Sequence, residues 1–269
     1  MNTLPPAVVV ALSGLAWTLA ASVATWLVSV VRKDASLADR MWPVLIAGCG
    51  FTYWAWSPTM DVRVIALLVL SGAWGLRLCA YISVRNWGHG EDHRYRAMRE
   101  RNSPNFAGKS LYLVFGLQAV LAWIVSAPLM SGALAPPSSL GVVDMAGISL
   151  AAFGIGFEAV GDAQMARFKS DSSHAGQVMD KGLWRFTRHP NYFGETCVWW
   201  GLWLLALSGA GWAGAWTVVS PVLMTVLLLR VSGVSLLEKD IAERRPAYRD
   251  YMQRTNAFIP GPPRQGAKQ

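Results

Sequence analysis

The sequence is short of charge and of cysteine. Only 15% of its 269 residues are charged and 53% belong to the hydrophobic set, whereas about a quarter of the residues in a soluble domain are charged. The three cysteines lie far apart, with no CxxC spacing and no Cys/His cluster beside them. This scarcity excludes a disulfide-stapled module and indicates no metal site. The composition also excludes a disordered chain and a collagen-like fibre.

Long apolar blocks take the place of charge. Most of them are near the roughly 20 residues that a helix needs to cross the hydrocarbon core of a membrane. Continuous apolar runs of this length are helical, and in lipid only helices and closed barrels satisfy their backbone. The blocks predict an all-α bundle of seven transmembrane helices in a single domain, at residues 4–31, 43–57, 62–84, 111–130, 140–160, 192–207 and 212–229.

The net charge of +8 falls between these blocks and orients the bundle. Lysine and arginine are frequent in the connections 85–110 and 161–191 and in the tail 230–269. The alternate connections contain neither, and Arg63 is the only basic candidate on that side. Because cytoplasmic loops carry an excess of Lys and Arg, the N-terminus is predicted outside and the C-terminus in the cytoplasm. We expect membrane lipids as partners, no nucleic acid and no obligatory protein partner.

Ionisable residues at the membrane boundary indicate a site on the cytoplasmic side. Arg77 lies inside the third block, Asp39 precedes the second and Asp162 follows the fifth. Such groups are costly in a membrane unless they are paired or functional. Together they predict a polar cavity that opens to the cytoplasm and is apolar toward the membrane centre. The alternative is a set of structural ion pairs between helices.

The most specific string is GLWRFTRHPNYFGE, residues 182–195. Pro190 suits the first position of a helix, which places Asn191 and Glu195 four residues apart on one face. Free backbone amides at this helix start, with Arg188 and His189 beside them, favour an anion such as a cofactor phosphate. The alternative is a capped helix anchored at the membrane interface by Tyr and Arg.

With this string, the sequence resembles the family of membrane reductases related to steroid 5-alpha-reductase, in particular the bacterial branch described as domain of unknown function 1295. The other segments that carry the resemblance are Asp39 with Trp42-Pro43, Trp74 to Arg77, Gly90 to Asp92 with Arg94-Tyr95, and Asp162 with Gln164 and Phe168-Lys169. The C-terminal half is less specific, because a similar Arg-His-Pro-x-Tyr-x-Gly element occurs in sterol double-bond reductases and membrane methyltransferases.

The resemblance implies an enzyme of the bacterial inner membrane with its active site facing the cytoplasm. It implies that NADPH reduces the conjugated carbon–carbon double bond of a 3-oxo-4-ene steroid, or of a similar hydrophobic enone from the bilayer. The cofactor contacts that it implies are Arg77, Asp162, Arg167, Lys169, Arg188, His189, Asn191, Tyr192, Glu195 and Trp199.

The resemblance also implies an acid that holds the substrate carbonyl, and Asp39 is the nearest match. To donate a hydrogen bond Asp39 would have to carry a proton, which burial against apolar walls can favour. Its structural alternative is an ion pair with Arg77 or Arg40. On the last helix, the family's His and Tyr contacts appear as Val234 and Glu238.

The family's partner tyrosine falls at Trp74, which is a departure from the pattern. An indole donates a hydrogen bond but cannot act as a general acid. Tyr53, Tyr81 or Tyr95 could take over this role from elsewhere in the chain.

Three further interpretations of the sequence are open beside this one. Gly154, Gly156 and Ala159 match the G-x-G-x-x-A spelling of a dinucleotide fingerprint, but they lie inside an apolar helix with no preceding strand, so we expect a close helix–helix contact there. The Arg-His-Pro-x-Tyr element also fits an S-adenosylmethionine-dependent membrane methyltransferase of the isoprenylcysteine or phospholipid type. The many Arg and Lys in the cytoplasmic loops favour NADPH, which has an additional phosphate. A non-catalytic lipid-binding scaffold would leave the clustered polar residues unexplained.

Overall fold

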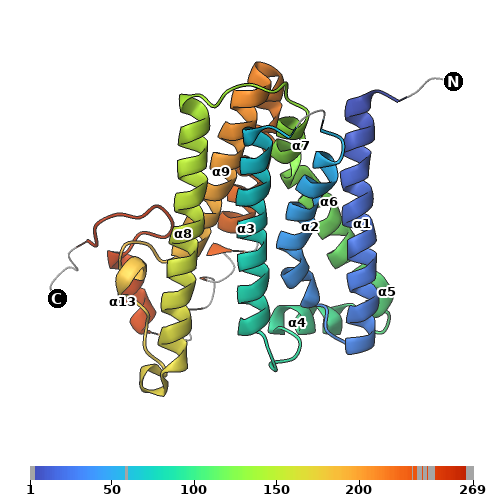
Figure 1. The fold of residues 1–269 in the computed structure, drawn as a ribbon. Helices are drawn as coiled ribbons and strands as arrows, with labels where there is room; N and C mark the ends of the chain where they lie inside the picture. The colour runs from blue at the N-terminus through green and yellow to red at the C-terminus, as the bar shows by residue number, and fades with distance from the viewer. Residues whose placement is uncertain are drawn as a thin grey trace. The chain divides into compact units, whose positions relative to one another are not determined.

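A computed structural model describes residues 4–57, 60–231, 233–234, 238, 241 and 246–264, and this part of the chain is helical without a strand (Figure 1). The all-α class predicted from the apolar blocks is confirmed. The chain forms two compact units. Unit 1 comprises Met1–Ile148 and Leu202–Ser220, and unit 2 comprises Ser149–Gly201 and Pro221–Gln269.

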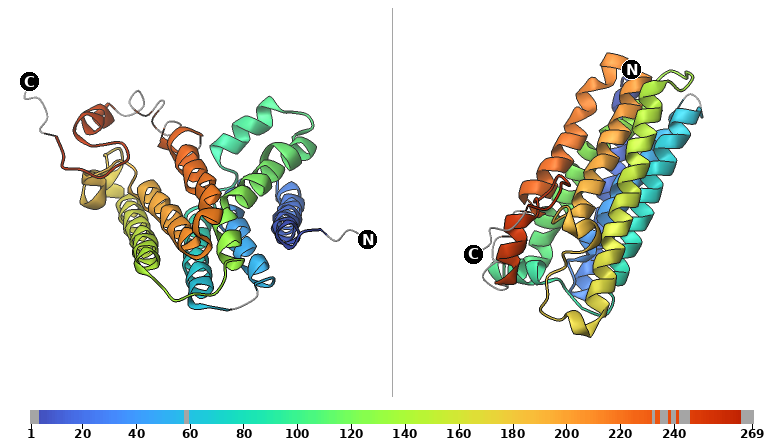
Figure 2. Two further views of the ribbon diagram at one scale, coloured as in Figure 1. Left: turned by 90° about the horizontal axis from the view of Figure 1, so that it is seen from above. Right: turned by 90° about the vertical axis from the view of Figure 1, so that its left-hand side faces the viewer.

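Unit 1 is built on three long helices. The elements up to residue 133 are α1 (Pro6–Arg32), α2 (Leu37–Trp54), α3 (Val62–Arg85), α4 (His93–Arg101), α5 (Phe106–Ser110), the π-helix η1 (Leu111–Gly116), α6 (Leu117–Val125) and α7 (Ala127–Ala133). α2 packs between α1 and α3, and α6 and α7 also pack on α2. These three helices run side by side, and α4 lies across their ends (Figures 1 and 2).

The rest of the chain contains two further long helices. The elements are α8 (Val142–Ser170), the 3-10 turns η2 (Ser172–His174) and η3 (Gly182–Arg185), α9 (Pro190–Ala210), the 3-10 segment η4 (Gly211–Val218), α10 (Val219–Val226), the π-helix η5 (Leu227–Val231) and α13 (Ala247–Arg254). The boundary between the two units falls within α8 and α9.

Five helical segments of the described chain are long and apolar enough to cross a membrane: Pro6–Arg32, Val62–Arg85, Phe106–Val125, Val142–Ser170 and Pro190–Val231. They mark an integral membrane protein. The second predicted block is helical within α2 but is not one of the five. The sixth and seventh blocks lie in the single run Pro190–Val231. Inside that run Gly211 has a φ of 59°, a left-handed conformation that ends α9.

Several predicted helix limits are wrong. α2 begins at Leu37 instead of residue 43 and contains Pro43, whose missing N–H removes one backbone hydrogen bond. The block 111–130 is divided at Ser126, with Pro128 in the first turn of α7. α8 continues to Ser170, ten residues beyond the predicted end at residue 160. Basic side chains in its last turn suit the negative end of the helix dipole.

Arg63 is buried in an ion pair within unit 1. Its Nε lies 2.7 Å from Oδ1 of Asp144, and its Nη2 donates to Oδ2 at 3.2 Å. Ser208 also donates to Asp144, at 2.8 Å. Arg63, the one basic candidate of the predicted outer side, is therefore neutralised inside the protein. The difference in Lys and Arg between the two sets of connections is unchanged.

In unit 2 the backbones of α8 and α9 lie in close contact. A Cβ atom built on Gly154 would lie 2.5 Å from the carbonyl oxygen of Gly194, and one on Gly194 would lie 2.7 Å from the backbone nitrogen of Glu158. The predicted helix–helix contact is confirmed for Gly154. It is wrong for Gly156, which is exposed and where an added Cβ would have no atom within 4 Å.

Candidate functional site

Asp39, in the first turn of α2, is the centre of a polar group in unit 1. Its Oδ2 accepts a hydrogen bond from Nη2 of Arg94 at 2.7 Å, and its Oδ1 accepts one from the hydroxyl of Tyr95 at 2.6 Å. Asp39 therefore forms its ion pair with Arg94, where the sequence suggested Arg77 or Arg40. In this arrangement Asp39 accepts both hydrogen bonds. The hydroxyl proton between Tyr95 and Asp39 is on Tyr95.

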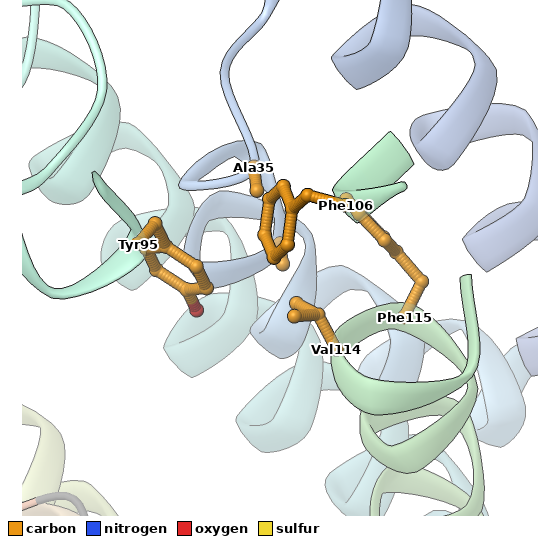
Figure 3. Packing of buried hydrophobic residues seen from close by; sticks show 6 residues of the cluster. Ala35, Tyr95, Phe106, Val114 and Phe115 are labelled. Carbon is orange, nitrogen blue, oxygen red and sulfur yellow. The ribbon is translucent and has the colours of Figure 1, made fainter. Parts of the chain in front are cut away.

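Tyr95 is held by apolar packing on α4. Its ring belongs to a buried cluster with Ala35, Ala38, Phe106, Val114 and Phe115. Figure 3 shows the ring beside Ala35 and Phe106, with the hydroxyl oxygen at the edge of the cluster. Burial and the neighbouring charge of Asp39 raise the pKa of Tyr95 well above its ordinary value. The phenol is thus a neutral hydrogen-bond donor at physiological pH.

The string Gly90 to Asp92 fixes α4 against the start of α2. Asp92 caps α4 by accepting hydrogen bonds from the backbone nitrogen and Nε of Arg94, at 2.9 and 3.0 Å. Glu91 accepts from Nη2 and Nε of Arg99, at 2.7 and 2.9 Å, and from the backbone of Ala35 at 2.8 Å. Burial opposes ionisation of both acids, but the arginine hydrogen bonds outweigh it and lower the pKa of Asp92 and of Glu91.

Two other predicted positions in unit 1 lie in its packed interior. Trp74 is fully buried in α3. Tyr53 is fully buried in α2, and its hydroxyl lies 2.8 Å from Oγ of Ser126. Asp39 is fourteen residues from Tyr53 on the same helix, which corresponds to about 21 Å along the axis. Tyr95 is thus in contact with Asp39, whereas Tyr53 lies far from it along α2.

In unit 2, Arg188 and His189 meet at Glu238. The guanidinium of Arg188 binds Glu238 through both oxygens, with Nε–Oε1 and Nη2–Oε2 distances of 2.7 and 2.8 Å. Nε2 of His189 lies 2.9 Å from Oε1, and its ring stacks on that of Tyr192. Burial opposes ionisation of Glu238, but Arg188 and His189 together lower its pKa to about 2. Glu238, which the sequence comparison marked as a departure from the family, is therefore the centre of this cluster.

The same segment binds the C-terminal part of the chain. Nη1 of Arg188 donates to the carbonyl oxygens of Met252 and Thr255, at 3.1 and 2.5 Å. Thr187 donates to the carbonyl of Phe258 at 2.7 Å, and the Tyr251 hydroxyl donates to the carbonyl of Trp184. Arg188 is thus committed to protein acceptors. The phosphate contact expected of it would require it to leave some of them.

The remaining predicted cofactor residues of unit 2 lie around the start of α9. Helix α9 begins at Pro190 as expected, and Asn191, Glu195 and Trp199 follow at spacings that share one face. Glu195 and Trp199 are buried. The side-chain oxygen of Asn191 is buried too, and no partner for it lies among the described residues.

The end of α8 lies against this first turn of α9. A Cβ on Gly161 would lie 3.1 Å from the Pro190 ring, and the next residue, Asp162, is buried. Arg167 and Lys169 are exposed in the last turn of α8. Arg77, by contrast, belongs to α3 of unit 1 and is half-buried.

The described residues contain no group of three or more His, Cys, Asp or Glu side chains arranged to hold a metal ion. The fold, with the polar groups around Asp39 and Glu238, defines a helical integral membrane protein with buried polar groups at helix ends. The chain belongs to the family described as protein of unknown function (DUF1295), whose profile matches residues 25–255. This range includes every candidate residue from Asp39 to Glu238.

One similar protein comes from a eukaryote. The chain is 24% identical, over 266 residues, to an uncharacterized protein of Schizosaccharomyces pombe, and the match covers 87% of this chain and 75% of that protein. No solved structure matches the chain.

Proposed function

We propose that the protein is an NADPH-dependent membrane reductase that reduces the conjugated double bond of a hydrophobic enone, such as a 3-oxo-4-ene steroid. The observation that carries this proposal is the 2.6 Å hydrogen bond from the Tyr95 hydroxyl to Asp39, with Arg94 on the other carboxylate oxygen. A neutral phenol beside a fixed carboxylate and a cation is a suitable group for polarising a carbonyl.

The residues of this group have separate roles in the proposed reaction. When bound, NADPH supplies a hydride to the beta carbon of the enone. Negative charge then develops on the carbonyl oxygen, where Tyr95 donates its hydrogen bond to the substrate in place of Asp39. Asp39 orients the phenol, and Arg94 binds the other oxygen of Asp39 and adds positive charge nearby. A proton reaches the alpha carbon to complete the reduction.

The residues of unit 2 fit a phosphorylated nucleotide that carries a carboxamide. The buried Asn191 oxygen has no partner among the described residues and can accept a hydrogen bond from the nicotinamide amide. Arg167 and Lys169 are exposed cations at one helix end, which suits phosphate groups. Glu195 and Asp162 are buried acceptors at the start of α9 and near the end of α8.

The proposed enzyme crosses the bacterial inner membrane seven times. Adding α2 to the five apolar segments and dividing the last of them at Gly211 gives this number. The basic connections 85–110 and 161–191 then lie in the cytoplasm with the active site and the C-terminus, and the N-terminus lies outside.

Isotope transfer tests this proposal. The purified protein is given NADPH deuterated at C4 of the dihydronicotinamide and a panel of enones that includes a 3-oxo-4-ene steroid. We expect a product that has gained one deuterium at the beta carbon, and no product from the matching saturated ketone. A panel that yields no labelled product, with a protein that remains folded, would contradict the proposed reaction.

A further inference from the structure

A groove in unit 1 is lined by the end of α1 and by residues of the short helices α4 and α5. Most of its lining is apolar, and it includes Val30, Ala35, Phe106 and Ala107. Lys33 and Arg99 are the charged side chains that line it. Beside the groove, the Trp26 indole donates a hydrogen bond to the carbonyl oxygen of Ala107 at 2.8 Å.

The apolar lining continues along a membrane helix. α1 is one of the five segments that can cross a membrane, and it ends at Arg32, next to the groove. Val23, Leu27 and Val30 are exposed on α1 at spacings of four and three residues, so they form one stripe. Val30 belongs both to this stripe and to the groove. A hydrocarbon chain lying on the stripe can therefore continue into the groove.

Lys33 occupies a backbone position that favours glycine. Its φ of 53° and ψ of 39° are left-handed, and its N–H caps α1 by donating to the carbonyl of Val30 at 3.3 Å. A side chain at this position costs free energy that glycine avoids. The lysine is exposed. The cap uses only the backbone N–H of Lys33, so the ammonium group takes no part in it.

The carboxylates near the groove are already committed to the protein. Glu91 is bound by Arg99, whose guanidinium lies 4.7 Å from the centre of the Phe106 ring. Asp34 accepts a hydrogen bond from the backbone of Ser36. The carboxylates of Glu91 and Asp34 thus have partners within the protein, and the ammonium of Lys33 can bind an anion at the edge of an apolar surface that Arg99 also lines.

We propose that this groove binds one anionic phospholipid, with an acyl chain on Val30, Phe106 and Ala107 and the phosphate at Lys33 and Arg99. The occupant is a lipid because the cations lie at the end of a membrane-crossing helix and the apolar lining continues along that helix. This proposal is independent of the proposed reductase activity.

The test uses the full-length protein in detergent with phosphatidylglycerol or phosphatidylcholine, and native mass spectrometry gives the dissociation constant of the first bound lipid. Lys33→Gly keeps the left-handed cap without strain and removes the ammonium. We expect it to bind phosphatidylglycerol about fivefold more weakly, the effect of one cation near a lipid phosphate. Its melting temperature without lipid should equal or exceed that of the wild type.

Matched variants separate a specific site from general charge. Arg101→Gln removes another exposed cation of α4, which does not line the groove and whose Nε donates to the carbonyl of Ala97 in its own helix. It should bind lipid as the wild type does, and Lys33→Arg should retain binding. Should Lys33→Gly express poorly, Lys33→Gln gives the same comparison.

Three outcomes would overturn the proposal. Unchanged phosphatidylglycerol affinity in Lys33→Gly would exclude Lys33 from any lipid site. Equal wild-type affinity for phosphatidylcholine would show a groove without selectivity for an anion. Inorganic phosphate that stabilises the protein as well as phosphatidylglycerol does, at equal concentration, would identify a soluble anion instead of a lipid.

Discussion

At Asp39 two donors share one carboxylate, and their positions decide which residue carries the proton. Arg94 binds one oxygen and Tyr95 the other, and the Tyr95 ring is fixed in the cluster around Phe106. Asp39 accepts both of these hydrogen bonds. The phenol is then the donor that remains for a substrate carbonyl, and the aspartate positions it.

Tyr95→Phe is expected to reduce kcat for enone reduction by about 100-fold or more, because it removes the hydrogen-bond donor to the substrate carbonyl and keeps the ring packing. NADPH affinity should be unchanged. Asp39→Asn, which retains an acceptor oxygen, should lose less activity than Asp39→Ala. Steady-state kinetics of the purified variants measures both effects.

Tyr53→Phe is the matched control. It removes a hydroxyl that is bonded to Ser126 in the packed interior, so we expect about 1 kcal/mol less stability and nearly normal kcat. A Tyr95→Phe enzyme as active as the wild type, or a Tyr53→Phe enzyme that is inactive but stable, would assign the donor to another residue.

Glu238 is expected to make the stability of the protein depend on pH. Its ordinary pKa of 4.5 is lowered to about 2 in the folded protein. Because the folded value is depressed, its contribution to stability is complete above about pH 4.5 and is lost as the pH falls toward 2. Glu238→Gln leaves Arg188 without a counter-charge and should cost about 3 kcal/mol at pH 7.

Thermal unfolding between pH 7 and 3 measures this effect. The stability difference between wild type and Glu238→Gln should shrink as the pH falls. A difference that is constant over this range would show that the charge of Glu238 contributes nothing to the folded state.

Among the helices, α8 and α9 approach each other closely through their backbones. The two nearest neighbours of a Cβ at Gly154 are backbone atoms of α9, which cannot move aside as a flexible side chain could. Gly154→Ala should therefore cost about 1–3 kcal/mol by overpacking.

Gly156→Ala is the control, because it makes the same change two residues along the same helix. No atom lies within 4 Å of the added carbon there, so the higher helix propensity of alanine should raise the stability by up to about 1 kcal/mol. Equal effects of the two substitutions on unfolding in detergent would mean that the helices do not pack as described.

The helices themselves could be predicted from hydropathy, but their ends could not. An apolar run indicates which residues suit lipid, whereas a helix begins where a side chain satisfies its free amides. Asp61 caps α3 by accepting from the backbone of Val64, and Asp92 caps α4. The extension of α8 to Ser170 is polar, so it lies outside any hydropathy signal.

The candidate site was predictable only where its residues are close in sequence. Asn191 and Glu195 share a helix face because of their spacing. The contacts of Asp39 with Arg94 and Tyr95 span 55 and 56 residues and depend on how α4 folds against α2. The pairing of Arg188 with Glu238 spans 50 residues, and a local motif contains no information about it.

For the whole molecule, the two units carry different parts of the proposed chemistry. Asp39, Tyr95 and Arg77 belong to unit 1, and the other cofactor candidates belong to unit 2. The proposed reaction requires the cofactor to be NADPH. The competing methyltransferase requires S-adenosylmethionine instead.

Thermal stability with each cofactor added separately tests this claim most directly. A ligand that binds only the folded state stabilises it, by about 2.7 kcal/mol at a concentration 100 times its Kd. We expect NADPH to raise the melting temperature of the wild type, S-adenosylmethionine to leave it unchanged, and Asn191→Ala to weaken the effect of NADPH. Stabilisation by S-adenosylmethionine and not by NADPH would contradict the account.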